Sequence, residues 1–125
     1  MSNEKALIIA IDDDTFTLTS IKDALSSEYK VMLAMDPEAG MNLVLKHFPQ
    51  LVILDINMPT LSGMEVAQML RRVESTRTIP IVFLSGYDTP LEMKQAEQLG
   101  AEAFLIKPCT LEEVSRTVGE ILNKQ

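Results

Sequence analysis

Short apolar runs alternate with longer segments of helical periodicity along the whole chain. A short apolar run bounded by turn residues is typical of a strand buried on both faces, and strands that alternate with helices favour a parallel sheet covered on both sides. The predicted fold is therefore α/β, a single (βα)5 doubly wound parallel sheet. Its predicted strands are Ala6–Ile11, Tyr29–Leu33, Leu51–Leu54, Ile79–Leu84 and Ala103–Ile106, of which the second has the weakest pattern.

The segments between these runs carry the start signals of helices. Asp14 and the Asp36-Pro37 pair are predicted N-terminal caps. Thr89 and Thr110 each precede a glutamate by three residues, which is the spacing of a capping box. The third helix is predicted over Met64–Val73.

Length and composition fit one domain. A chain of 125 residues with 46% hydrophobic side chains can build one core and leaves no room for a second folded unit. No repeat, linker or low-complexity segment interrupts the pattern. We expect residues 1–125 to form one domain with its core in Ala6–Leu122, and no output domain in this chain.

Charge and cysteine usage argue against several classes of protein. Eighteen acidic and eleven basic side chains give a net charge of −7, which repels a phosphate backbone and disfavours direct nucleic-acid binding. No run approaches the roughly 20 apolar residues of a membrane span, and Met1–Lys5 lacks the start of a signal peptide. Cys109 is the single cysteine and cannot form an internal disulfide. We therefore expect a cytoplasmic protein away from the membrane, in which Cys109 is structural.

Polar side chains stand at the ends of four predicted strands. Asp12 and Asp13 follow the first, and Asp55, Ser85 and Lys107 follow the third, fourth and fifth. Because the carboxyl ends of parallel strands form the ligand-binding edge of such sheets, these groups should converge. Carboxylates within about 4 Å repel by roughly 1–4 kcal/mol per pair, and a cation between them relieves this. An all-oxygen cluster suits Mg²⁺, with Mn²⁺ as the alternative, and predicts a metal-assisted phosphoryl site.

The residue types suggest a division of roles at this edge. Lys107 offers a compact positive charge to a phosphate, and the Ser85 hydroxyl offers a hydrogen bond. Asp55 stands alone on its strand and is the better nucleophile, because a carboxylate accepts a phosphoryl group without a base. Asp12 and Asp13 are the better metal ligands. Each signal alone also fits a turn or a helix cap, but their coincidence at four strand ends favours a shared site.

Four motifs resemble those of one known family. They are Ile9–Asp14, Leu54–Pro59 followed by Gly63, Phe83–Gly86 and Ala103–Pro108. Their order and spacing, over essentially the whole chain, resemble the receiver domain of two-component response regulators. The resemblance implies a flavodoxin-like strand order 2-1-3-4-5, with the ligand at the switch between strands one and three.

The same resemblance implies a role for each site residue. Asp55 would be the phosphoacceptor, and Ser85 and Lys107 would hold the phosphoryl oxygens. The implied Mg²⁺ ligands are the carboxylates of Asp13 and Asp55, the backbone carbonyl of Asn57, and Asp12 through water.

The resemblance further implies a signalling switch and not a conventional turnover enzyme. The domain would catalyse its own phosphorylation on Asp55, from the phosphohistidine of a sensor histidine kinase or a hybrid-kinase phosphorelay, and its own dephosphorylation. The aspartyl phosphate would draw Ser85 inward, and Phe104 would fill the vacated space. The face made by the fourth helix, fifth strand and fifth helix would then regulate a partner or an output domain. A homodimer through the fourth and fifth helices stays open.

Some positions depart from the usual family pattern. Phe104 stands where tyrosine is frequent, so it can report only burial. Cys109 replaces a frequent aromatic residue after the Lys107-Pro108 bond, which the resemblance implies is cis. We expect the Tyr87 ring to shield the aspartyl phosphate, so that Tyr87→Ala would lose phosphate faster. The residues expected at the site mouth are Met58, Gly86 and Tyr87.

Two other functions share part of this pattern. Asp12–Phe16 echoes the Asp-x-Asp-x-Thr/Val signature of haloacid-dehalogenase phosphatases, but Phe16 breaks it and the chain leaves little for a cap. Phosphorylation that depends on Asp12 instead of Asp55 would favour that class. A receiver-fold docking module that works without phosphate would have no need of the intact acidic and basic set. Absence of any phosphotransfer would favour the docking module.

Overall fold

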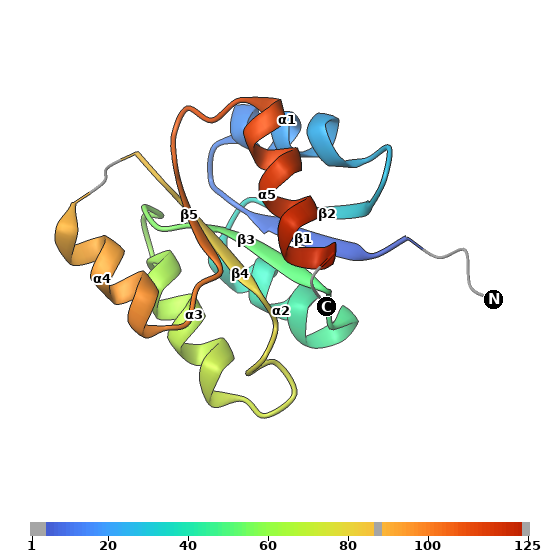
Figure 1. The fold of residues 1–125 in the computed structure, drawn as a ribbon. Helices are drawn as coiled ribbons and strands as arrows, with labels where there is room; N and C mark the ends of the chain where they lie inside the picture. Colours follow the sequence, from blue (N-terminus) through green and yellow to red (C-terminus); the bar gives the residue numbers. More distant parts are fainter. Residues whose placement is uncertain (1–4, 87–88, 124–125) are drawn as a thin grey trace.

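Five parallel strands form one sheet at the centre of the molecule (Figure 1). The computed structural model describes residues 5–86 and 89–123. The strand order is β2-β1-β3-β4-β5, which confirms the predicted fold class and the order that the resemblance implied. The strands are β1 (Leu7–Ile11), β2 (Lys30–Ala34), β3 (Leu51–Asp55), β4 (Ile81–Ser85) and β5 (Ala103–Ile106).

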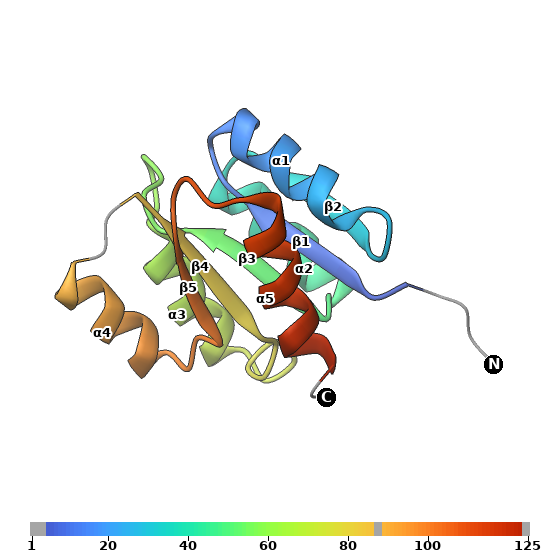
Figure 2. The ribbon, with the colours of Figure 1, turned by 45° about the horizontal axis from the view of Figure 1, so that its top comes forward.

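A helix follows each strand, and the helices cover both faces of the sheet (Figures 1 and 2). α1 and α5 pack on one face, whereas α2, α3 and α4 pack on the other. The helices are α1 (Thr15–Leu25), α2 (Pro37–His47), α3 (Gly63–Arg72), α4 (Pro90–Gln98) and α5 (Leu111–Asn123).

The central strands are apolar throughout because both of their faces are buried. In β1, Ile8 and Ala10 pack in the cluster under α1 and α5, whereas Ile9 and Ile11 pack in the cluster under α2, α3 and α4. Alternate side chains of a strand point to opposite faces, so a strand covered on both sides needs an unbroken apolar run. This burial holds the carboxyl ends of the strands at fixed places along one edge.

The predicted helix caps are present. Asp14 accepts a hydrogen bond from the backbone N–H of Phe16, and Asp36 accepts one from that of Ala39. Of the capping box predicted at Thr89, the structure shows the hydrogen bond from the Glu92 N–H to Thr89 Oγ1, whereas the Glu92 carboxylate lies 3.4 Å from Ser85 Oγ. Thr110 exchanges two hydrogen bonds with the glutamate three residues on, as a capping box requires.

Several predicted boundaries differ from the structure, and β1 and β2 each begin one residue later than predicted, at Leu7 and Lys30. β4 begins at Ile81 and not at Ile79, since Pro80 has no N–H to donate to the ladder. β3 and β4 each extend by one residue, so that Asp55 and Ser85 are the last residues of their strands. The third helix begins at Gly63 instead of Met64, after an unpredicted capping box.

That capping box joins Ser62 and Glu65. The two residues have the serine–glutamate spacing of a capping box in the sequence, although the prediction did not include it. Gly63 next to it lies against the end of β3. Its N–H donates to Ile56 O at 3.0 Å, and a Cβ atom at this position would overlap the backbone carbonyl of Asp55. Only glycine allows this close approach of α3 to the strand end.

In the described part of the chain, no helix is long and apolar enough to cross a membrane.

Candidate functional site

Four strand ends bring the predicted polar residues to one edge of the sheet. The register pairs Ile11 with Leu54, and β4 continues the same edge through Ser85. Asp12 extends β1 by one backbone hydrogen bond to β2, and Lys107 follows β5 with its N–H donating to Ser85 O at 2.7 Å. The Lys107-Pro108 peptide bond is cis.

The three acidic residues form one cluster across the β1–β3 boundary. Carboxylate oxygens of Asp12, Asp13 and Asp55 all lie within 4.8 Å of one another. Asp12 and Asp55 are buried, with exposures of 0% and 1%, whereas Asp13 is exposed. The cluster therefore has two buried carboxylates and one that is exposed to solvent.

One buried oxygen in this cluster lacks a hydrogen bond. Asp12 Oδ1 accepts from the Asp14 N–H at 2.9 Å, but no group in the described residues makes a hydrogen bond to Asp12 Oδ2. Lys107 Nζ lies 2.8 Å from this oxygen, so the partner of Asp12 Oδ2 is the ammonium, through an ion pair. An all-oxygen set of this kind fits a hard divalent cation such as Mg²⁺.

Lys107 bridges the two buried carboxylates. Its Nζ also lies 3.3 Å from Asp55 Oδ1. Burial opposes the charged form of Lys107, but the interactions with the Asp12 and Asp55 carboxylates outweigh it and raise the pKa of the ammonium. The side chain therefore stays positively charged beside Asp55.

Asp55 is a weaker acid than an ordinary aspartate. Burial, and then the negative charge of Asp12, raise the pKa of Asp55 from 3.8 to about 6. Lys107 and the Asn57 N–H, which lies 3.3 Å from Asp55 Oδ1, act in the opposite direction. Near neutral pH the Asp55 carboxylate is still largely ionised, and its oxygens can act as a nucleophile.

Ser85, the last residue of β4, links Asn57 to α4. Its Oγ lies 3.3 Å from Asn57 Oδ1 and 3.4 Å from Glu92 Oε1. Glu92 was not among the predicted site residues, because its sequence position marks it only as the partner of the Thr89 cap. Its reach to Ser85 depends on how α4 is docked, which no local pattern reports.

The remaining predicted residues lie at different depths. Met58 is 7% exposed and belongs to the core, whereas Gly86 is exposed with open space beside it. Phe104 is half-buried and packs against the cluster under α2, α3 and α4. Tyr87, predicted beside the site mouth, lies outside the described residues.

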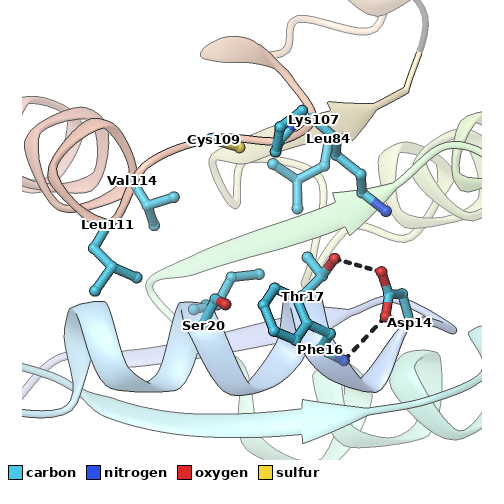
Figure 3. Close-up of a pocket in the computed structure, with 11 residues that line it drawn as sticks. Asp14, Phe16, Thr17, Ser20, Leu84, Lys107, Cys109, Leu111 and Val114 are labelled. Atoms are coloured by element: carbon cyan, nitrogen blue, oxygen red, sulfur yellow. Dashed lines mark hydrogen bonds between the residues drawn. The ribbon is translucent and has the colours of Figure 1, made fainter.

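A cavity of about 290 Å³ opens beside Lys107, between the start of α1 and the start of α5 (Figure 3). Asp14 stands at its mouth and accepts hydrogen bonds from the Phe16 N–H and the Thr17 hydroxyl. Cys109 lines the cavity, and burial raises the pKa of its thiol, which keeps it in the less reactive protonated form. The further lining residues include Ile21, Leu84, Leu111 and Val114.

Comparisons with known proteins match the chain to one domain family. The sequence pattern described as response regulator receiver domain matches residues 8–118. Response regulator MprA of Mycobacterium sp. (strain KMS) is 33% identical over 118 residues, which are 94% of this chain and 50% of that protein. This chain spans about half the length of the curated relatives it matches.

Solved structures agree with the sequence comparison. A response regulator from Desulfuromonas acetoxidans is 28% identical, with a TM-score of 0.85 over 95% of this chain and 98% of that one. A CheY-like receiver domain protein from Methanospirillum hungatei JF-1 shares the fold, with a TM-score of 0.90, 24% identity and coverage of 97% and 96%.

Proposed function

This chain belongs to the response regulator receiver domain family, and on that premise we propose that it is a phosphoacceptor switch that takes a phosphoryl group onto Asp55. The observation that carries the proposal is the surroundings of Asp55. A buried carboxylate lies 3.3 Å from the Lys107 ammonium and within 4.8 Å of two further carboxylates. Such a concentration of like charge beside one cation suits an incoming phosphoryl group and a metal ion.

The proposed reaction is a direct displacement at phosphorus. An Asp55 oxygen attacks the phosphorus of a phosphohistidine as the N–P bond breaks, and the imidazole nitrogen keeps that electron pair. The new O–P bond leaves an aspartyl phosphate on this chain and a histidine on the donor. Lys107 and Ser85 donate to the transferred oxygens, and no general base is required.

The acidic cluster would hold the metal ion that this chemistry needs. Asp12, Asp13 and Asp55 would provide its protein ligands together with the Asn57 carbonyl, for Mg²⁺ or, as the alternative, Mn²⁺. The bound cation supplies neutralisation of negative charge on the carboxylates and on the phosphoryl oxygens. The closeness of the Asp12, Asp13 and Asp55 carboxylate oxygens, all within 4.8 Å of one another, supports this assignment.

The output of the switch is proposed for the face made by α4, β5 and α5. α4 buries only Ala96 of its nine residues, and Leu91 and Ile106 are exposed on this face. Ser85 would turn to the phosphoryl group and Phe104 would follow into the space, which shifts the populations of two arrangements of this face. A sensor histidine kinase or hybrid-kinase phosphorelay in the cytoplasm would donate the phosphoryl group. A downstream partner or output domain would read the change.

The experiment is an intact-mass measurement after incubation with Mg²⁺ and acetyl phosphate. We expect one added phosphoryl group that is absent with EDTA and absent in Asp55→Ala. An adduct that requires Asp12 as nucleophile and survives Asp55→Ala would support the phosphatase class. If neither acetyl phosphate nor a panel of phosphorylated histidine kinases yields an adduct, the protein is a docking module and the proposal is wrong.

A further inference from the structure

Glu92, in the first turn of α4, reaches the acceptor site through a chain of polar contacts. The Asn57 N–H donates to Asp55 Oδ1, and Asn57 Oδ1 lies 3.3 Å from Ser85 Oγ. Glu92 Oε1 lies 3.4 Å from the same hydroxyl. The contacts therefore run without interruption from the acceptor carboxylate to the start of α4.

The Ser85 hydroxyl cannot satisfy both of these acceptors at once. A hydroxyl has one proton to donate, and both Asn57 Oδ1 and the Glu92 carboxylate are acceptors. Hydrogen bonds to a charged acceptor are the stronger kind, which favours Glu92 when the two distances are nearly equal. Because Ser85 is fully buried, the choice is made within the protein and away from bulk solvent.

α4 has little apolar packing to fix its position. Only Ala96 is buried within Pro90–Gln98, and α4 lies at the outer edge of the molecule in both ribbon views (Figures 1 and 2). Its C-terminal end is held by Arg71 of α3, whose Nε donates to Leu99 O at 2.8 Å. The Glu92–Ser85 contact ties the opposite end to the site, so a change at Ser85 acts directly on the first turn of α4.

We propose that Glu92 is a positioning residue that holds the Ser85 hydroxyl towards α4 and so opposes phosphorylation of Asp55. This inference rests on the proposed function. A phosphoryl group on Asp55 adds a further acceptor, and the hydrogen bond of the Ser85 hydroxyl turns from Glu92 to it. Its negative charge also repels the Glu92 carboxylate, and the first turn of α4 is released.

Because of this exchange, phosphorylation of Asp55 and the position of α4 are coupled, so each favours the other. A partner that draws the first turn of α4 outward removes Glu92 from Ser85 and favours the phosphorylated state. By the same coupling, phosphorylation favours binding of that partner. The restraint is specific to a carboxylate at this position, because an uncharged side chain there competes less for the proton.

The test compares Glu92→Gln and Glu92→Ala with the matched control Glu97→Gln on the same helix. Glu97 is exposed, and the control makes the same charge change near the far end of α4. Both substitutions at Glu92 keep the backbone N–H that the Thr89 cap uses. With acetyl phosphate and Mg²⁺, we expect about threefold to tenfold faster phosphorylation of Asp55 in the Glu92 variants, and the wild-type rate in Glu97→Gln.

A double-mutant cycle with Ser85→Ala separates positioning from a general effect of charge. If Glu92 acts through the hydroxyl, Glu92→Gln changes nothing in the Ser85→Ala background, and the Mg²⁺ affinity of the single variant equals that of the wild type. An equal acceleration with and without the hydroxyl would overturn the inference, as would an unchanged or slower rate in Glu92→Gln. A wild-type protein that takes no phosphoryl group would sink the proposed function and this inference together. A competent wild type with unresponsive Glu92 variants would sink this inference alone.

Discussion

The raised pKa of Asp55 predicts that replacing the acceptor with its neutral isostere stabilises the metal-free fold. Asp55 is 1% exposed, and burial with the nearby Asp12 charge raises its pKa from 3.8 to about 6. A difference of about two pKa units corresponds to about 3 kcal/mol between the ionised and neutral forms. Asp55→Asn removes this cost and keeps the size of the side chain, so its free energy of unfolding in EDTA at pH 7.5 should exceed that of the wild type by up to about 3 kcal/mol.

The pH dependence gives the sign of this prediction. A folded-state pKa that is raised means that the contribution of protonated Asp55 to stability is fully present below pH 3.8 and is lost as the pH rises through about 6. The advantage of Asp55→Asn should therefore be small at pH 4, grow up to about pH 6 and level off above it.

Urea unfolding with EDTA at four pH values measures this gap. Asp23→Asn, an exposed aspartate on α1, is the matched control and should stay within about 0.5 kcal/mol of the wild type. Adding Mg²⁺ should stabilise the wild type, by about 1.4 kcal/mol at ten times its dissociation constant, and stabilise Asp55→Asn less. A gap that does not change with pH, or a variant less stable than the wild type at pH 7.5, would refute the reasoning.

Three further substitutions test the supports of the site by urea unfolding at pH 7.5. Lys107→Met leaves the two buried carboxylates without their cation and should lower the free energy of unfolding by about 1–3 kcal/mol, with a smaller loss at pH 5; an equal loss at both pH values would contradict this. Gly63→Ala forces a Cβ into the end of β3 and should lower the free energy of unfolding by at least about 2 kcal/mol. Gly86→Ala meets open space and should lower it by less than about 0.5 kcal/mol. Equal losses would count against the close approach of α3 to β3. Arg71→Gln removes donors from three backbone carbonyls and should cost about 2 kcal/mol and speed hydrogen exchange in α4, unlike its exposed neighbour Arg72→Gln.

The positions of the site residues along the chain were predictable because they follow from the sheet. Alternation of apolar runs and helical segments fixes a parallel sheet, and a parallel sheet puts all its carboxyl ends on one edge. The ends of β1, β3, β4 and β5 therefore had to bring Asp12, Asp55, Ser85 and Lys107 to one side. Knowing which segments are strands, and that the strands are parallel, is enough to place these four residues at one edge.

The contacts between these residues were not predictable, because they depend on side-chain direction and helix docking. Adjacent Asp12 and Asp13 read alike in the sequence, yet the first is fully buried and the second exposed. Arg71 donates to carbonyls up to 28 residues away. Glu92 contacts Ser85, although the sequence marks Glu92 only as a residue of the N-terminal cap of α4. Such contacts are set by the tertiary packing of α3 and α4, which the periodicity of the sequence does not report.

The free energy of one hydrogen bond limits how far the proposed switch can shift the populations of its two states. Moving an equilibrium from 1:99 to 99:1 needs about 5.5 kcal/mol of differential interaction, whereas exchanging one hydrogen-bond acceptor for another supplies roughly 1–2 kcal/mol. In the proposed switch, turning the Ser85 hydrogen bond from Glu92 to a phosphoryl group therefore cannot drive the complete change alone. The rest has to come from the charge of the phosphoryl group itself, through attraction to Lys107 and repulsion of Glu92. Removing either the attraction to Lys107 or the repulsion of Glu92 should therefore reduce the shift between the two states only in part. Removing both should abolish the shift.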